Sequence, residues 1–209
     1  MLHEFALVVP VKPPTVGKSR LRGIDDEHRR ALAQAFALDT IAVCLEGGAA
    51  GVLVSTDDAA FAVHCAALGC ATMPDGDSND LNSALGQAAA EARRRWPYAV
   101  PVALCADLPA LTTVDLRSAL RNVTAGTPAF VADAAGTGTT LYTGSYAAFD
   151  PRFGAGSRRA HLETGATEIG GALPTLRLDV DDLDDLRAAI DLGVGPQTRS
   201  LAHLVAAAG

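Results

Sequence analysis

The sequence lacks a surplus of positive charge. Its 209 residues hold 17 lysines and arginines against 24 aspartates and glutamates, a formal net charge of −7. A protein that binds nucleic acid or an anionic membrane along a broad surface needs the opposite balance. We therefore expect neither partner, and any anion site has to be local.

The sequence also has few cysteines and no long apolar run. Cys44, Cys65, Cys70 and Cys105 form no Cys-x-x-Cys pair and have no histidine at zinc spacing, which favours buried free thiols over disulfides or a zinc site. The first apolar segment, Phe5–Val11, is too short to span a membrane and meets proline and lysine instead of a cleavage site. These features predict a cytoplasmic protein with no membrane contact.

Several catalytic signatures are missing as well. There is no Gly-x-Ser-x-Gly, no Ser/His/Asp arrangement and no His-Glu-x-x-His. The sequence therefore lacks the residues that serine hydrolases and zinc proteases need for catalysis. The five histidines are scattered, and we expect them to be structural or solvated. A Gly-Lys-Ser triplet at 17–19 is half of a Walker A motif, but position 12, where that motif needs glycine, is lysine.

What the chain does contain is an alternation of strand-length apolar runs and helical stretches. The pattern predicts strands at Phe5–Val11, Gly51–Ser55, Cys70–Met73, Val100–Cys105, Ala129–Ala132, Thr140–Thr143 and Leu176–Leu178. It predicts helices at Asp26–Glu46, Asp57–Leu68, Leu81–Arg95, Thr113–Val123 (capped at Thr113), Asp181–Leu192 and Gln197–Ala207. This order is typical of a single Rossmann-like α/β domain with three layers and a mixed, mostly parallel sheet.

Acidic residues stand at the ends of two predicted strands. Asp107 follows a buried-looking strand and precedes Leu-Pro, and Asp179 and Asp181 follow a later one. Carboxylates at the opening edge of a sheet are suited to hold Mg²⁺, which takes one or two of them together with phosphate oxygens and water. For the Asp179 segment, capping of the next helix remains an equal alternative.

Three loops could bind the anions that such a metal accompanies. Lys12, Lys18 and Arg20 follow the first strand and could clamp a triphosphate, or could form a solvated basic surface. The glycine-rich stretches 136–139 and 154–157 could direct backbone N–H groups and hydroxyls at a carboxylate or phosphate, or could be ordinary turns. The loop that holds Asp75 could read a base edge, or could end in a helix cap at Asn79 or Asp80.

Taken in order, these motifs resemble one family. Val-Pro-Val-Lys, Gly-Lys-Ser-Arg-Leu, Leu-Asn-Ser-Ala-Leu, Asp-Leu-Pro-Ala-Leu, Gly-Thr-Gly-Thr, Phe-Gly-Ala-Gly-Ser and Leu-Asp-Val-Asp run along essentially the whole chain. The set is similar to the phosphoenolpyruvate and 2-phospho-L-lactate guanylyltransferases of coenzyme F-420 biosynthesis. The resemblance implies a nucleotidyltransferase fold with a nucleotide-binding half at 1–125 and an acceptor-binding half at 126–209.

The resemblance also implies the roles of single residues. It places phosphoenolpyruvate at Thr139, Gly154 and Ser157, Mg²⁺ at Asp107 and Asp179 with Asp181 beside them, and GTP at the first-strand loop and the Asn82 segment. Lys18 and Arg20 are the expected catalytic cations, and Lys12, Asp75 and Asn82 complete the nucleotide site. The proline pair at 13–14 stiffens the loop next to Lys12, where the family's pattern leads us to expect smaller residues.

The activity implied is the condensation of GTP with phosphoenolpyruvate to enolpyruvoyl-2-diphospho-5′-guanosine and pyrophosphate. The residues leave 2-phospho-L-lactate and 3-phosphoglycerate open as acceptors, because these acids differ little. Three other functions remain open for this protein: another nucleotidyltransferase, a P-loop NTPase and a non-catalytic nucleotide-binding regulator. A downstream transferase that takes up the product is the expected partner.

Overall fold

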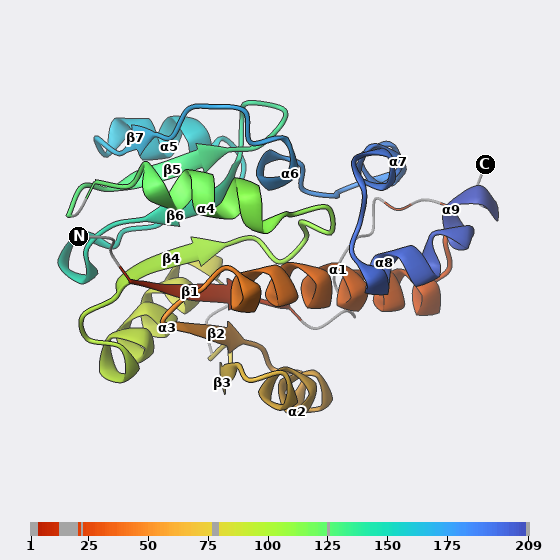
Figure 1. Cartoon of the computed structure of the whole chain (residues 1–209), viewed down its shortest axis with the longest axis horizontal. Helices are drawn as coiled ribbons and strands as arrows, with labels where there is room; N and C mark the ends of the chain where they lie inside the picture. Colours follow the sequence, from red (N-terminus) through yellow and green to blue (C-terminus); the bar gives the residue numbers. More distant parts are fainter. Residues whose placement is uncertain (1–3, 13–20, 22, 77–79, 125, 208–209) are drawn as a thin grey trace.

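A mixed sheet runs through the structure, a computed structural model that describes residues 4–12, 21, 23–76, 80–124 and 126–207 (Figure 1). Its strands, in the order β3-β2-β1-β4-β6-β5-β7, are β1 (Phe5–Pro10), β2 (Gly51–Ser55), β3 (Ala71–Met73), β4 (Val100–Leu104), β5 (Ala129–Ala132), β6 (Thr139–Thr143) and β7 (Thr167–Glu168). Strand β6 pairs antiparallel with β4 and β5, and the other pairs are parallel. The expected mixed, mostly parallel sheet is confirmed.

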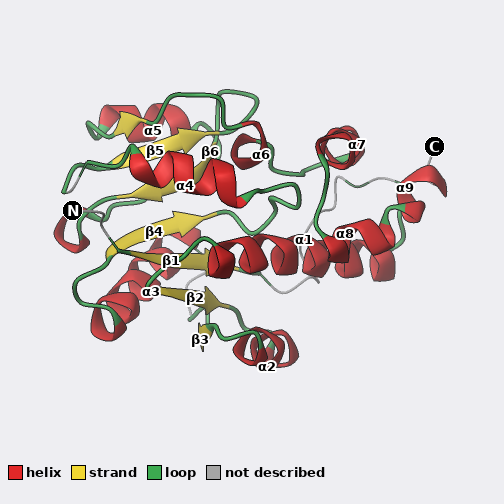
Figure 2. Cartoon of the chain, viewed as in Figure 1, coloured by secondary structure: helices red, strands yellow, loops and turns green. Residues whose placement is uncertain are grey.

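Helices cover both faces of this sheet (Figure 2). They are α1 (Asp26–Glu46), α2 (Ala59–Ala67), α3 (Leu81–Arg95), α4 (Thr113–Arg121), α5 (Ser157–Glu163), α6 (Pro174–Arg177), α7 (Leu183–Leu192), α8 (Pro196–Leu201) and α9 (His203–Ala207), with a 3₁₀ turn η1 (Tyr146–Ala148). Side-chain caps fix several starts: the carboxylates of Asp25 and Asp80 accept backbone N–H groups in the first turns of α1 and α3.

The alternation of side chains along β1 explains the layers. Leu7 and Val9 pack into the core under α1 and α4, while Ala6 and Val8 face the alanine-rich side of α3. All four are at most 1% exposed, and full burial of a leucine or valine side chain contributes about 1.5–3 kcal/mol. A strand buried on both sides needs apolar residues at every position, which the sequence of β1 supplies.

The C-terminal helices α7, α8 and α9 pack against α1, on the right of Figure 1. Their apolar side chains surround Leu32 and Phe36 of α1. The carboxylate of Asp39, 4% exposed, accepts hydrogen bonds from the backbone N–H groups of Gln197 at 3.0 Å and Thr198 at 2.8 Å. One buried carboxylate of α1 therefore fastens the start of α8.

Most predicted elements are confirmed, and the bounds of β2, β5, α1 and α3 are those expected. The predicted strand Leu176–Leu178 is wrong: Pro174 opens the short helix α6 there, because proline suits the first turn of a helix. The three residues of that segment, Leu-Arg-Leu, are too few for their periodicity to tell a strand from a helix. The two-residue strand β7 was not expected.

Several helices differ from expectation at their ends or caps, among them α2, which is Ala59–Ala67 and not Asp57–Leu68. Thr112, not Thr113, caps α4, and its hydroxyl accepts from Asp115 N–H at 3.3 Å. Helix α7 begins at Leu183, behind the cap Asp182. The predicted helix Gln197–Ala207 is two helices that meet at Ala202, and no proline or glycine there explains the break.

We predict that Asp39→Asn lowers the free energy of unfolding by about 1–3 kcal/mol, because an amide can accept only through its single oxygen and leaves a buried N–H unsatisfied. Asp191→Asn, an exposed change on α7, is the matched control and should cost under about 0.5 kcal/mol. Urea unfolding of both variants measures the difference. Equal stabilities would refute the anchoring role of Asp39.

Candidate active site

Residues of the predicted site gather at the carboxyl edge of the sheet. Lys12, Asp75 and Asp107 follow the parallel strands β1, β3 and β4. Because β6 runs in the opposite direction, its first residue, Thr139, lies at this same edge, and Cys105 N–H donates to Thr140 C=O at 2.9 Å. Ligands of open α/β sheets bind at this edge.

Asp107, Asp179 and Asp181 form a carboxylate cluster. One oxygen of each lies within 4.8 Å of the others. The Val180 N–H donates to the Asp107 carbonyl at 3.0 Å, so the segment after α6 lies against the end of β4. Val180 is fully buried in the core with α7, and its two neighbours therefore turn their carboxylates the other way, toward Asp107.

The backbone around Asp107 is held from α1. The Thr40 hydroxyl, fully buried, accepts from Leu108 N–H at 3.2 Å and lies 3.2 Å from the Ala106 carbonyl and 2.9 Å from that of Phe36. The residues on both sides of Asp107 are thus tied to a rigid helix. Sequence reasoning missed Thr40, and a lone threonine within a helix gives no signal for such a role.

The electrostatics of the cluster suit a divalent cation. Burial, and next the charge of Asp107, raise the pKa of Asp179 to about 7, with Asp181 and Asp133 adding to the rise. Negatively charged carboxylates this close together repel one another. A divalent cation bound between them removes this repulsion, and carboxylate oxygens are the hard ligands that such a cation prefers. Asp107, Asp179 and Asp181 are thus the described residues that could hold such an ion.

The alternative role as a helix cap is taken by other residues. Asp182 accepts from the backbone N–H groups of Asp184 at 2.9 Å and Asp185 at 3.0 Å. Asp185 completes the capping box by accepting from Asp182 N–H at 3.1 Å. The capping of α7 therefore does not use the side chain of Asp179.

Asp133 shapes the first glycine-rich loop. Its two carboxylate oxygens accept from Thr137 N–H and Gly138 N–H, both at 2.8 Å. A Cβ at Gly138 would collide with that carboxylate, so the close approach requires glycine. Asp133 was missed, although it stands at the end of a strand, as Asp107 does, and this signal could have identified it.

The second glycine-rich loop lies against the first. Arg158 N–H donates to Thr137 C=O at 3.1 Å, which joins the start of α5 to the loop before β6. Gly154 and Gly156 have φ of 127° and 71°, conformations that glycine adopts readily. Ser157 is 2% exposed. Thr139, at the start of β6, and Gly154 and Ser157, at the start of α5, are thus carried by segments that contact each other.

Asn82 connects the two halves of the chain. Its Nδ2 donates to Phe153 C=O at 3.0 Å, and its Oδ1 accepts from Phe153 N–H at 2.8 Å. Asp80 caps α3, which confirms the capping alternative for that loop. The predicted nucleotide residue Asn82 therefore also holds the second glycine-rich loop, a contact that the sequence did not indicate.

The other residues predicted to bind the nucleotide do not form one cluster. Asp75 is 8% exposed and accepts from the Ser55 hydroxyl at 3.1 Å. Lys12 is exposed, and its charge lowers the pKa of Asp80, although hydrogen bonds from Ser83 are the main cause. Lys18 and Arg20 lie outside the described residues.

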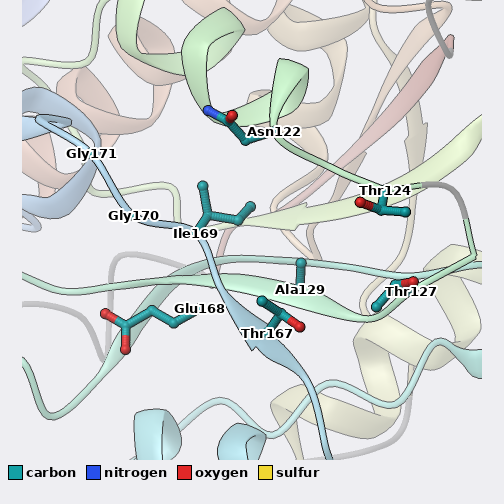
Figure 3. Close-up of a pocket in the computed structure, with 9 residues that line it drawn as sticks. All are labelled: Asn122, Thr124, Thr127, Ala129, Thr167, Glu168, Ile169, Gly170 and Gly171. Atoms are coloured by element: carbon teal, nitrogen blue, oxygen red, sulfur yellow. The ribbon is translucent and has the colours of Figure 1, made fainter.

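A pocket of about 440 Å³ lies elsewhere, between the end of α4 and the starts of β5 and β7 (Figure 3). Its lining includes Asn122, Thr127, Ala129, Thr167 and Ile169. Since β5 and β7 begin there, the pocket opens at the edge opposite the carboxylates, and it contains none of the predicted site residues.

Within the described chain, no helix has the length and apolar character needed to cross a membrane.

Comparison with known proteins decides the family. The family described as "Guanylyl transferase CofC like" matches residues 5–202. The chain belongs to this family. A phosphoenolpyruvate guanylyltransferase of Thermomonospora curvata is 45% identical over 95% of this chain and 88% of its own length. One of Streptomyces coelicolor is 45% identical over 99% of both chains. The protein is therefore a nucleotidyltransferase enzyme of the guanylyl-transferring kind.

Solved structures agree on the fold. A Desulfovibrio desulfuricans protein assigned to the nucleotide-diphospho-sugar transferases has a TM-score of 0.73 at 17% identity, covering 98% of this chain and 97% of that one. A Mycobacterium tuberculosis protein solved with manganese has a TM-score of 0.57 at 20% identity, covering 91% and 100%. The predicted Rossmann-like nucleotidyltransferase fold is confirmed.

We predict that the affinity for a divalent cation falls about tenfold per pH unit below about pH 7, because the ion has to displace a proton from Asp179. The folded pKa lies above the ordinary 3.8. The metal-free protein should therefore also lose stability as the pH rises from about 4 to 7. Calorimetric titration with Mg²⁺ and Mn²⁺ across this range measures the slope, with Asp182→Asn as the control. A pH-independent affinity would contradict the assignment of Asp179.

Proposed function

We propose that this protein transfers guanylate from GTP to phosphoenolpyruvate in coenzyme F-420 biosynthesis, with Mg²⁺ as its metal. The observation that carries the proposal is the position of the carboxylate cluster. Asp107 lies at the same sheet edge as Thr139, which is the first residue of the expected acceptor pocket. A metal-held nucleotide and a phosphorylated acid could therefore meet there.

The reaction needs little from a general base. The acceptor's phosphate has a second pKa of about 6, so near neutral pH it is mostly a dianion and a competent nucleophile. One of its oxygens forms a bond to the α-phosphorus of GTP, and the bond from that phosphorus to the bridging oxygen of the β-phosphate breaks. Pyrophosphate leaves with the electron pair, and the product is a diphosphate joining guanosine to enolpyruvate.

The protein's main task is to align two anions that repel each other. Asp107, Asp179 and Asp181 would hold Mg²⁺, which when bound neutralises negative charge on the phosphates. The hydrogen bonds from Leu108 N–H to the Thr40 hydroxyl and from Val180 N–H to the Asp107 carbonyl keep these carboxylates in place before substrate arrives. Such preorganisation lowers the barrier because no reorientation is needed during the reaction.

The two substrates divide the remaining residues. Thr139, Gly154 and Ser157 bind the carboxylate and phosphate of the acceptor through hydroxyl and backbone N–H donors. Lys12, Lys18, Arg20, Asp75 and Asn82 serve GTP, and among them Lys18 and Arg20 stabilise charge on the departing pyrophosphate. This division also assigns the nucleotide to the half at 1–125 and the acceptor to the half at 126–209.

The choice of phosphoenolpyruvate over 2-phospho-L-lactate or 3-phosphoglycerate is supported by the names of the relatives. A sugar phosphate or molybdopterin acceptor is disfavoured because the loop at 154–157 is short. The product would pass to a downstream transferase in the cytoplasm, and neither nucleic acid nor membrane takes part.

We expect the purified protein with Mg²⁺ to convert GTP and phosphoenolpyruvate into enolpyruvoyl-2-diphospho-5′-guanosine at a rate at least about tenfold above that with the other two acids. Mass spectrometry of the products identifies the adduct, and a coupled downstream transferase protects a labile product. Adenylated products from an ATP control, or a preference for another acid, would contradict the proposed substrates.

We further expect Asp107→Asn and Asp179→Asn each to reduce turnover by at least about a hundredfold, because each removes an anionic metal ligand. Asp182→Asn is the matched control, since asparagine caps a helix as well as aspartate does and its position adjoins the cluster. Turnover is measured at limiting Mg²⁺, with circular dichroism to verify the fold. Wild-type turnover in either cluster variant would remove that residue from the metal site.

A further inference from the structure

His161 is a buried titratable group for which the reaction gives no use. It lies on α5, is 0% exposed, and stacks on the rings of Phe130 and Tyr142 at centroid distances of 5.2 and 4.7 Å. Phe153 meets it edge-on at 5.8 Å. An imidazole buried among aromatic rings is costly unless both of its nitrogens have partners.

Both nitrogens have partners, and these partners fix the tautomer. The backbone N–H of Arg152 lies 2.9 Å from Nε2 and can only donate, so Nε2 accepts. Burial, the main cause, lowers the pKa of His161 to about 4, so the ring is neutral near pH 7. In a neutral imidazole the other nitrogen then carries the hydrogen, and Nδ1 is therefore a donor.

Two acceptors lie beside the ring, the Ser157 backbone, whose hydrogen bond partly offsets the fall in the His161 pKa, and the side chain of Thr139. Nδ1 of His161 lies 3.0 Å from the Thr139 Oγ1. Because Nδ1 carries a hydrogen, the threonine cannot donate to it, and the hydroxyl hydrogen has to point to a different partner. The ring therefore sets the direction in which Thr139 donates.

The same ring restrains the second glycine-rich loop. Arg152, which donates to Nε2, precedes Phe153 and Gly154 in the chain, and Phe153 is held by Asn82. His161 itself follows Ser157 by one helical turn. One neutral ring thus connects the strand residue Thr139 with the entry of the loop 154–157.

We propose that His161, as a neutral Nδ1–H tautomer, is a positioning residue that aims the Thr139 hydroxyl hydrogen at the phospho-acid acceptor and holds the loop 154–157 around it. This inference rests on the proposed function, because it requires Thr139 to contact the acceptor. His161 touches neither substrate and exchanges no proton in the reaction. Its effect is on acceptor affinity and not on the nucleotide.

The kinetic test uses His161→Phe, which keeps an aromatic ring in the stack and removes both nitrogens. We expect the KM for phosphoenolpyruvate to rise about tenfold or more while the KM for GTP changes by less than about twofold. Thr139→Val should give the same split, and Thr139→Ser should largely restore the wild-type values. A purely structural role would lower stability and the active fraction without separating the two KM values.

Thr143→Val is the matched control for the threonine variants. Thr143 lies on the same strand, is fully buried, and donates to the Pro101 carbonyl at 2.9 Å. Removing its hydroxyl therefore measures how the loss of any buried hydroxyl in β6 affects stability and the two KM values. We expect this variant to lose stability and to keep both KM values. An equal rise of the acceptor KM in Thr143→Val would overturn the specific role of Thr139 and His161.

The tautomer is measured in the wild-type protein, so it does not depend on the folding of any variant. With ¹⁵N-labelled histidine, the His161 ring should give the NMR pattern of a neutral Nδ1–H imidazole, assigned in the wild-type protein by through-bond correlation of the ring with its own backbone. A neutral Nε2–H ring or an imidazolium would overturn the inference.

The kinetic outcomes also separate this inference from the proposed function. If the wild-type protein forms no product from GTP and phosphoenolpyruvate, the proposed function fails and the acceptor role of Thr139 fails with it. If product forms but His161→Phe keeps the wild-type acceptor KM, only the inference about His161 fails.

Discussion

The site depends on one backbone hydrogen bond, from Val180 N–H to the Asp107 carbonyl at 3.0 Å. It joins the end of β4 to a segment more than seventy residues later and sets Asp179 and Asp181 beside Asp107. Thr40 secures the β4 side of this junction, and the burial of Val180 in the core with α7 secures the other. Three carboxyl groups are held together because the backbone that carries them is fixed by packing.

The reversed strand β6 has a comparable effect on the proposed acceptor pocket. If β6 were parallel to β4, Thr139 would begin at the opposite edge of the sheet, far from the carboxylates. In the antiparallel pairing, Leu104 lies opposite Leu141, and the loop ahead of β6 meets the start of α5 through Arg158 and Thr137. The mixed topology therefore brings the two glycine-rich loops, which we propose bind the acceptor, to the edge of the sheet that carries the carboxylates.

Local patterns in the sequence were enough to predict the elements and part of the site. Apolar alternation located β2, β5, α1 and α3 at their observed bounds, and an aspartate after a strand identified Asp107. Local patterns could not predict contacts that depend on the folded chain, such as the Asn82 amide on the backbone of Phe153 or the His161 ring between Thr139 and Arg152. The strand predicted at 176–178 was wrong for a local reason, because Pro174 starts a helix where Leu176 and Leu178 suggested a strand.

The central claim is that Asp107, Asp179 and Asp181 bind the divalent cation on which guanylyl transfer depends. Its most direct test is a crystal structure of the protein with Mn²⁺ and GTP, measured at a wavelength where manganese scatters anomalously. The account predicts an anomalous peak coordinated by oxygens of these carboxylates at about 2.0–2.3 Å and by phosphate oxygens of the nucleotide. A manganese peak away from the three aspartates, or bound nucleotide with no metal beside them, would contradict it.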